Sequence, residues 1–175
     1  TRALVDVDIE IGRGEIRGLI GENGSGKSTF SNILSGSLHA DSGSFEFKGK
    51  SYSPKHMVDA QNCGISMIVQ ELGTIGAIDT GSNIFAGRLN ELSKLGFINF
   101  KELHRKANRI LDGIGAPEIR SEIMTAALNF EDRKIVEVAR AMAYDPDLLI
   151  VDETTTALAH KGREILYKLI KKMYS

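Results

Sequence analysis

The sequence has one cysteine, three prolines and no tryptophan. The single cysteine, Cys63, excludes a disulfide within the chain and also a cysteine-rich zinc site. No apolar run approaches the ~20 residues that a membrane-spanning helix needs, and the first residues lack the pattern of a signal peptide. If the protein serves a membrane, we therefore expect it to act from the cytosolic side, through partners.

The chain also lacks an excess of either charge. Its 22 lysines and arginines nearly balance its 23 acidic residues, so the net charge is -1. A mixed, solvated surface explains this balance, and we expect no nucleic-acid partner and no attraction to an acidic membrane surface. The composition is otherwise ordinary, and 175 residues are enough for one domain with one core.

What the chain does have is a glycine loop, Gly21 to Ser28, which fits the pattern G-x-x-x-x-G-K-[ST]. The apolar-leaning run 15–20 predicts a strand before this loop, and the apolar spacing over 29–34 predicts a helix after it. In that order, backbone N–H groups and a helix N-terminus can bind phosphate oxygens. The alternative is a chance glycine-rich turn, and the flanking segments count against it.

We therefore interpret the loop as a phosphate-binding site. Lys27 would reach the β and γ phosphates, and the Ser28 hydroxyl would be a ligand of Mg²⁺. The residues assigned to the nucleotide in this part of the chain are Gly21, Asn23, Gly24, Ser25, Gly26, Lys27, Ser28 and Thr29.

Several other segments have recognisable periodicity. Residues 4–11 and 45–48 alternate apolar and polar side chains, which predicts a small antiparallel sheet beside the nucleotide. The apolar run 65–69 predicts a buried strand, and the continuous run 148–151 predicts a strand buried on both faces of a parallel sheet. Helices are predicted from Pro54 to about 62, near 82–88, and over 100–114, 130–144 and 161–174, while most of 71–99 is predicted to be loop.

Two acidic residues, Asp152 and Glu153, directly follow the run 148–151. In P-loop enzymes, an acid at the end of such a strand holds Mg²⁺ or its water. A second acid next to it can polarise an attacking water as a general base. Taken alone, the pair reads more simply as a helix cap or a surface feature. Because the glycine loop is also present, we instead favour the roles of magnesium ligand and general base for these two acids.

At this point the sequence resembles the ATP-binding cassette ATPases over nearly its whole length. Residues 21–29 are similar to the Walker A motif of that family, 69–71 to its Q-loop and 148–153 to its Walker B motif with the catalytic glutamate; 155–158 resemble the D-loop. The resemblance implies an α/β fold. It would consist of a P-loop NTPase core with a mixed, mainly parallel sheet, a small antiparallel β subdomain and an inserted helical subdomain at about 71–143.

The residues of these motifs are most similar to those of importers of the ribose, galactose and xylose type. The resemblance implies a subunit that binds ATP and Mg²⁺ and hydrolyses ATP to power import of a monosaccharide. Its partners would be membrane permease subunits and a second, tandem or dimeric cassette, and it would lie on the cytoplasmic face of the cell membrane. We expect residues 1–175 to be one nucleotide-binding domain of a longer protein, shortened at both ends.

The resemblance also assigns roles by position. Gln70 would join Ser28 and Asp152 around Mg²⁺ and contact the nucleotide, and Glu153 would activate the attacking water as the catalytic residue. The stretch just after Gln70 would contact the membrane subunit.

One motif departs from the family. The signature sequence LSGGQ should precede 136–141, and Leu128 to Asp132 stand there, with only the leucine kept. In the family this loop contacts the γ-phosphate of the opposite cassette. Phe130 is too bulky for that approach, and Glu131 and Asp132 would bring negative charge near triphosphate. The hypothesis is that this chain's own glycine loop is sound, whereas the site that it completes on a partner is weak.

Other features leave two alternatives open. Thr154 replaces a usual proline and Ala159 a frequent aspartate, and His160 comes too early to be the family's switch histidine. The altered signature and the missing switch histidine favour a regulatory or structural nucleotide-binding module with negligible turnover, which an intact Glu153 opposes. A soluble cassette ATPase of DNA repair or translation is the other alternative, and the short spacing between the Walker motifs argues against the repair type.

Overall fold

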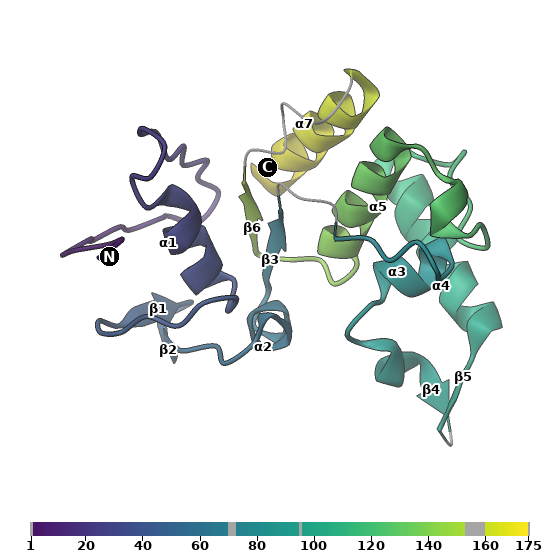
Figure 1. Cartoon of the computed structure of the whole chain (residues 1–175), viewed down its shortest axis with the longest axis horizontal. Coiled ribbons are helices and arrows are strands. Elements are labelled where there is room, and N and C mark those ends of the chain that lie inside the picture. Colours follow the sequence, from purple (N-terminus) through teal and green to yellow (C-terminus); the bar gives the residue numbers. More distant parts are fainter. Residues whose placement is uncertain (1, 70–72, 95, 153–159, 175) are drawn as a thin grey trace.

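The centre of the structure is a parallel pair of strands, β3 (Ile65–Ile68) and β6 (Leu148–Val151). The computed structural model describes residues 2–69, 73–94, 96–152 and 160–174. In the parallel pair, Ile65 lies opposite Leu148 and Ile68 opposite Val151. Both predicted strands are confirmed, and because they run parallel, the residues that follow them meet at one edge of the sheet (Figure 1).

One side of this pair carries the glycine loop, helix α1 (Lys27–Leu34), a hairpin of β1 (Phe45–Phe47) and β2 (Lys50–Tyr52), and helix α2 (Met57–Asn62) (Figure 1). Lys48 and Gly49 make the hairpin turn with φ of 54° and 71°. Tyr52 joins the hairpin to α1, since its hydroxyl donates to Leu34 O at 2.6 Å. Burial raises the pKa of Tyr52 to about 12. The predicted antiparallel subdomain is therefore present as one hairpin.

The other side is helical, as predicted for this part of the chain. It contains α3 (Thr80–Ile84), η1 (Leu89–Leu92), the short pair β4 (Ser93–Lys94) and β5 (Phe97–Ile98), α4 (Phe100–Ile114), η2 (Thr125–Ala127) and α5 (Phe130–Met142). Helix α7 (His160–Tyr174) packs against α5. Leu103, Ala107 and Leu111, which recur every four residues on the apolar face predicted for α4, are fully buried, and Ile114, three residues on, is also buried. Within the described ranges, no helix has both the length and the apolar character needed to span a membrane.

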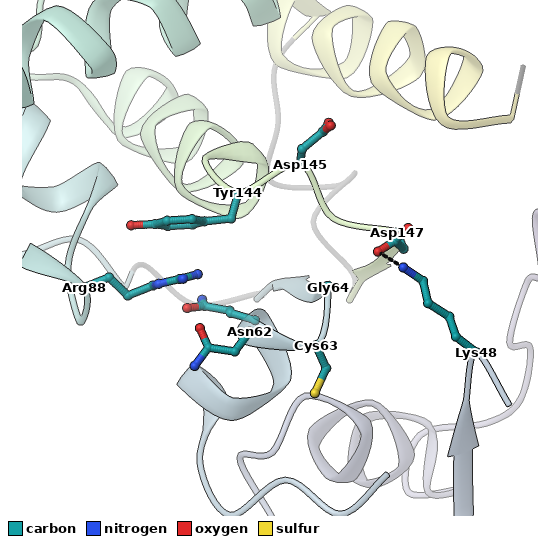
Figure 2. A pocket seen from close by; sticks show the side chains of 9 residues that line it. Lys48, Asn62, Cys63, Gly64, Arg88, Tyr144, Asp145 and Asp147 are labelled. Carbon is teal, nitrogen blue, oxygen red and sulfur yellow. Dashed lines mark hydrogen bonds and ion pairs between the residues drawn. The ribbon is translucent and has the colours of Figure 1, made fainter. Parts of the chain in front are cut away.

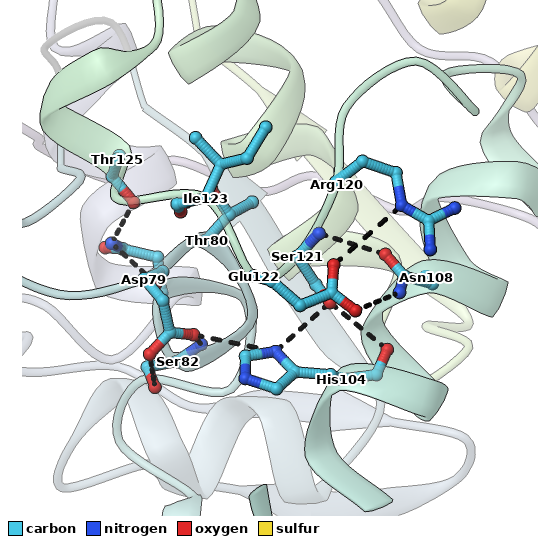
Figure 3. Close-up of polar contacts among 11 residues, drawn as sticks. Asp79, Thr80, Ser82, His104, Asn108, Arg120, Ser121, Glu122, Ile123 and Thr125 are labelled. Carbon is cyan, nitrogen blue, oxygen red and sulfur yellow. Dashed lines mark hydrogen bonds and ion pairs between the residues drawn. The ribbon is translucent and has the colours of Figure 1, made fainter. Parts of the chain in front are cut away.

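A polar network fixes the helical side internally (Figure 3). Asp79 caps α3 by accepting from Ser82 N and Ser82 Oγ, both at 2.8 Å. Asn108 on α4 accepts from Ser121 N at 2.9 Å. His104 Nδ1 lies 3.1 Å from Ser121 Oγ and 3.8 Å from Asp79 Oδ1. Because one ring nitrogen faces both groups, this Ser-His-Asp set lacks the geometry of a catalytic triad, in which the two partners bind opposite ring nitrogens.

The predicted strands over 4–11 and 15–20 are wrong. Among the described residues, this segment forms neither helix nor strand and pairs with no strand. Ile16 is 63% exposed and Ile20 98% exposed. Alternation indicates only that a segment can present one apolar face. A strand also needs a neighbour that supplies hydrogen bonds, and the described chain places none beside residues 4–20.

Three smaller predictions also need correction. The helix predicted from Pro54 begins at Met57, because Asp59 accepts from the N–H groups of Lys55 and His56 at 3.0 Å and holds the chain before the helix. The helix predicted near 82–88 lies at 80–84, where Asp79 caps it. The strand predicted to be buried on both faces, β6, is half-buried along its length.

Candidate functional site

The glycine loop adopts a conformation that two of its glycines make possible. Gly24 and Gly26 have φ of 83° and 90°, in the left-handed region that side chains disfavour. A Cβ atom at Gly26 would lie 2.6 Å from the carbonyl oxygen of Ala3. A side chain at Gly26 would therefore clash and strain the turn that leads into α1.

Lys27 folds over this loop. Its Nζ donates to the carbonyl oxygens of Gly21 and Glu22, each at 2.8 Å, and lies 3.4 Å from Ser25 Oγ. The ammonium group of Lys27 therefore binds oxygen atoms of its own loop, whereas the lysine of this motif would bind phosphate oxygens when a nucleotide is present. Hydrogen bonds to these carbonyl oxygens hold the ammonium group at the loop. Because its side chain is flexible, it could leave the carbonyl oxygens and bind an anion instead.

A cavity of about 280 Å³ opens at this point. The N-terminus of α1 faces the same region, so free backbone N–H groups and the helix dipole favour an anion there. The loop and first-turn residues that line the cavity include most of the predicted nucleotide contacts. They are Asn23, Gly24, Gly26, Lys27, Ser28 and Thr29, together with Ala3.

Two of the predicted magnesium ligands come together although they are far apart in the sequence. Ser28 Oγ donates to Asp152 Oδ1 at 3.4 Å. Asp152 is placed by β6 and by its own N–H, which donates to Ile68 O at 3.1 Å. A hydroxyl and a carboxylate at one edge of the sheet are oxygen donors of the type that Mg²⁺ prefers, so the residues fit this ion.

The other two predicted site residues, Gln70 and Glu153, lie outside the described residues. Their described neighbours do converge, since Val69 follows β3 and Asp152 follows β6. Sequence reasoning missed the charged side chains beside Val69, which are Lys134 and Glu137 on α5. The available signal was a lysine and an acid three residues apart on an otherwise apolar helix face.

The loop at 128–132 makes its polar contacts within the chain. Asn129 caps α5 by accepting from Asp132 N at 2.8 Å, and its amide donates to Asp132 Oδ2 at 2.9 Å. Gly162 N donates to Glu131 Oε1 at 3.4 Å, which links the loop to α7. Phe130 remains 54% exposed. The N-terminus of α5 therefore carries two carboxylates of its own, in the position where an anion would otherwise bind.

Desolvation raises the pKa of the Asp132 carboxyl above its ordinary value. Lys161 acts in the opposite direction, but Glu118 and Glu131 add to the increase. Lys161 forms an ion pair with Glu118. The loop surface is thus rich in acid, in contrast to the glycine loop.

A second cavity, of about 340 Å³, lies away from this site (Figure 2). It is bordered by Gly64 and Asp147, which precede β3 and β6, whereas Val69 and Asp152 follow the two strands. Arg88 lies over the ring of Tyr144 at 3.5 Å from the ring centroid, and Lys48 pairs with Asp147. Because it borders the opposite ends of the strands, this cavity is not part of the glycine-loop site.

The glycine loop, the helix that begins at Lys27 and the acid at the end of a parallel strand define a P-loop nucleotide-binding protein. The sequence matches the family described as ABC transporter over residues 4–156. The chain belongs to this family.

Solved structures support the same fold. A dimeric ATP-binding cassette in a post-hydrolysis state with ADP and Pi superimposes with a TM-score of 0.80 at 24% sequence identity, over 99% of this chain and 75% of that chain. The ADP conformation of another cassette gives a TM-score of 0.75 at 24% identity, over 98% of this chain and 70% of that chain.

Among curated relatives, ribose import ATP-binding proteins are similar to this chain in sequence. The ribose import ATP-binding protein RbsA of Yersinia pestis is 36% identical over 172 residues, which is 98% of this chain and 33% of that protein. The protein of the same name from Caldanaerobacter subterraneus is 33% identical over 98% of this chain and 34% of its own length. The chain therefore spans about a third of the length of these relatives.

The acidic loop predicts a pH-dependent stability. The raised pKa means that Asp132 binds a proton more readily in the folded than in the unfolded state, so its ionisation lowers stability as the pH rises from the ordinary value of 3.8. We expect Asp132→Asn to become more stable relative to the unmodified protein as the pH rises from acid to neutral. Urea unfolding at several pH values measures this difference.

Glu102 on α4 provides the opposite control. Its hydrogen bond from Arg105 lowers the pKa of Glu102 below its ordinary 4.5, so its contribution to stability is present above that pH and is lost as the pH falls. Glu102→Gln should therefore lose stability relative to the unmodified protein at neutral pH. A stability difference with the same pH slope for both variants would contradict the assignment for Asp132.

Proposed function

We propose that this chain is the ATP-binding and ATP-hydrolysing part of a transporter that imports a monosaccharide. The observation that carries the proposal is the contact of Ser28 with Asp152 beside the glycine loop, because it joins a phosphate-binding loop to a set of oxygen ligands for Mg²⁺. The family membership and the ribose import relatives support the transport assignment.

Each site residue has a distinct task in this proposal. Lys27 and the backbone N–H groups of 23–29 bind the β and γ phosphates, while Ser28, Gln70 and Asp152 hold Mg²⁺. The ion would neutralise charge on the phosphate oxygens. Glu153 accepts a proton from the attacking water, which displaces ADP from the γ-phosphoryl group. The protein accelerates the reaction by positioning these groups and by stabilising charge.

The partners follow from the same assignment. The chain would act on the cytoplasmic face of a membrane, bound to permease subunits and to a second cassette. Ribose is the sugar named for the relatives in Yersinia pestis and Caldanaerobacter subterraneus. The sugar itself would be selected by other subunits, because the residues described here form a phosphate site.

The residues of the loop at 128–132 indicate that the two ATP sites in a pair of cassettes would differ in their rate of hydrolysis. In a pair of cassettes this loop would face the γ-phosphate on the partner, and its cap, two acids and exposed Phe130 oppose that approach. We therefore propose that the site formed with this loop hydrolyses ATP slowly, while the glycine loop of this chain serves the productive site.

Lys27→Ala tests the phosphate site. A hydrogen bond to a charged group contributes about 1.5–3 kcal/mol, so Mg-ATP affinity should fall by roughly 10- to 100-fold. Isothermal titration calorimetry measures it, and Lys50→Ala, which removes an exposed lysine on β2, is the control. Binding by Lys27→Ala within twofold of the unmodified protein would contradict the assignment.

Glu153→Gln tests the general base in the full-length protein. The amide cannot accept the proton of water, so the turnover number should fall by at least about 100-fold while ATP affinity stays within twofold. Phosphate release and nucleotide binding measure the two quantities. Turnover that persists in this variant would exclude Glu153 as the base.

Restoring a small-residue loop tests the unequal sites. The quadruple change Asn129→Ser, Phe130→Gly, Glu131→Gly and Asp132→Gln should raise hydrolysis at the site formed with this loop by about tenfold or more, because it adds donors at the γ-phosphate and removes two negative charges. Because the other site already turns over, steady-state hydrolysis of the full-length protein should rise by about twofold. Phe130→Gly alone separates the steric effect from the charge effect. Unchanged hydrolysis in the quadruple variant would show that this loop does not limit turnover.

A further inference from the structure

Helix α5 buries two charged side chains beside the site. Lys134 has a side chain exposed to 0% and Glu137 to 5%, and Lys134 Nζ lies 3.0 Å from Glu137 Oε2. Removing both charges from water is costly, and a buried pair is often no more stable than an apolar pair of the same size. This placement therefore calls for a role other than general stability.

Both side chains bind backbone on either side of one short stretch. Lys134 Nζ donates to the carbonyl oxygen of Val69 at 3.2 Å. Glu137 Oε1 accepts from the N–H of Gly73. Val69 and Gly73 are the described residues that flank 70–72, the stretch that carries Gln70. One helix face thus binds the backbone of the described residues on both sides of this stretch.

Arg140, one turn further along α5, completes the arrangement. It donates to Gly73 O at 3.1 Å, to Asn83 O at 2.8 Å and to Asn83 Oδ1 at 3.1 Å. Asn83 is fully buried and also binds the backbone N–H and C=O of Ile75, each at 2.8 Å. Gly73 is therefore held through its N–H and its C=O, on a helix that is itself anchored to α3. We call Lys134, Glu137 and Arg140 the α5 clamp.

The α5 clamp is connected to the magnesium ligands by a short path. Val69 directly follows Ile68, the last residue of β3. Ile68 O accepts from Asp152 N at 3.1 Å, and Asp152 Oδ1 accepts from Ser28 Oγ at 3.4 Å. A shift of Val69 would move the end of β3, and with it the backbone bond that places the Asp152 carboxylate.

We infer that Lys134 and Glu137 are positioning residues for the magnesium site. By holding Val69 and Gly73, they fix the carboxyl end of β3, on which Asp152 depends, and both ends of the stretch that carries Gln70. This inference rests on the proposed function, since it concerns the ion that the site would bind with ATP.

The test compares two double variants of the full-length protein that remove both charges together. Lys134→Met with Glu137→Leu loses the bonds to Val69 and Gly73. Lys134→Met with Glu137→Gln keeps an acceptor for Gly73 N and loses only the bond to Val69. Both remove the charges of Lys134 and Glu137 together, and Arg140, whose charge Glu137 also stabilises, keeps its carbonyl acceptors at Gly73 and Asn83. We therefore expect both variants to fold, with the melting temperature and circular dichroism as checks.

The readout is ATP affinity with Mg²⁺ and with EDTA. We call the two double variants the Leu variant and the Gln variant, after the residue at position 137. In the Leu variant the gain in ATP affinity from Mg²⁺ should fall by roughly 10-fold or more, because loss of groups that orient metal ligands commonly lowers metal affinity 10- to 100-fold. Affinity in EDTA should stay within twofold, since Lys27 and the glycine loop are unchanged. The Gln variant should lie between the Leu variant and the unmodified protein, and the KM for Mg-ATP should rise in the same order.

Lys48→Met with Asp147→Leu, which makes the same substitutions at an exposed ion pair, is the control. It removes another ion pair, but this pair lies before β6, at the opposite end of the strand from Asp152. Its gain from Mg²⁺ should equal that of the unmodified protein.

The outcomes separate the two proposals. An unmodified protein whose ATP affinity does not depend on Mg²⁺ would overturn the proposed function itself. A normal gain from Mg²⁺ in the folded Leu variant would overturn the inference alone. Amide exchange in the unmodified protein is independent of all variants: the Gly73 amide should exchange as slowly as the interior of α5, and exchange at the rate of a free loop would also overturn the inference.

Discussion

The pairing of β3 with β6 is the constraint on which the rest of the site depends. These strands are separated by about 80 residues of mostly helical chain, yet they pair in parallel, with Ile68 opposite Val151. Their common direction brings Val69 and Asp152 to one edge. Helix α1 starts at the same edge, so that Ser28 reaches Asp152. In the described part of the chain, this edge therefore places the Asp152 carboxylate beside the helix that follows the glycine loop.

Helix α5 uses its two polar regions in different ways. Its N-terminus is closed by Asn129 and carries Glu131 and Asp132, whereas its buried face presents Lys134 and Glu137 to the backbone next to β3. Breaking a buried ion pair by removing one partner costs about 3–5 kcal/mol in measured cases. Under the proposed function, the N-terminus of this helix would bind a partner's phosphate poorly, while its buried face would support the site of its own chain.

Prediction from the sequence succeeded where local pattern and final environment agree. The helix over 100–114 was predicted with its observed bounds, because Leu103, Ala107 and Leu111 form one continuous apolar stripe that the core buries. The family resemblance implied that Ser28 and Asp152 lie around one ion, and the structure brings their side chains within 3.4 Å of each other; their role as magnesium ligands stays a prediction. The strands over 4–11 and 15–20 were predicted wrongly, because alternation does not reveal whether a partner strand lies beside them. Gln70 and Glu153 stay predictions, as both lie outside the described residues.

The sequence by itself determined the class of chemistry and the family, because the glycine loop, the acid after 148–151 and the altered residues of 128–132 are local patterns with direct physical meaning. Only the tertiary structure decided which groups support the site. Lys134 and Glu137 read as ordinary helix residues until the fold buries them against Val69 and Gly73, more than 60 residues away in the chain. The physical reason is that burial and distant hydrogen bonds arise from packing between segments, which no local pattern contains.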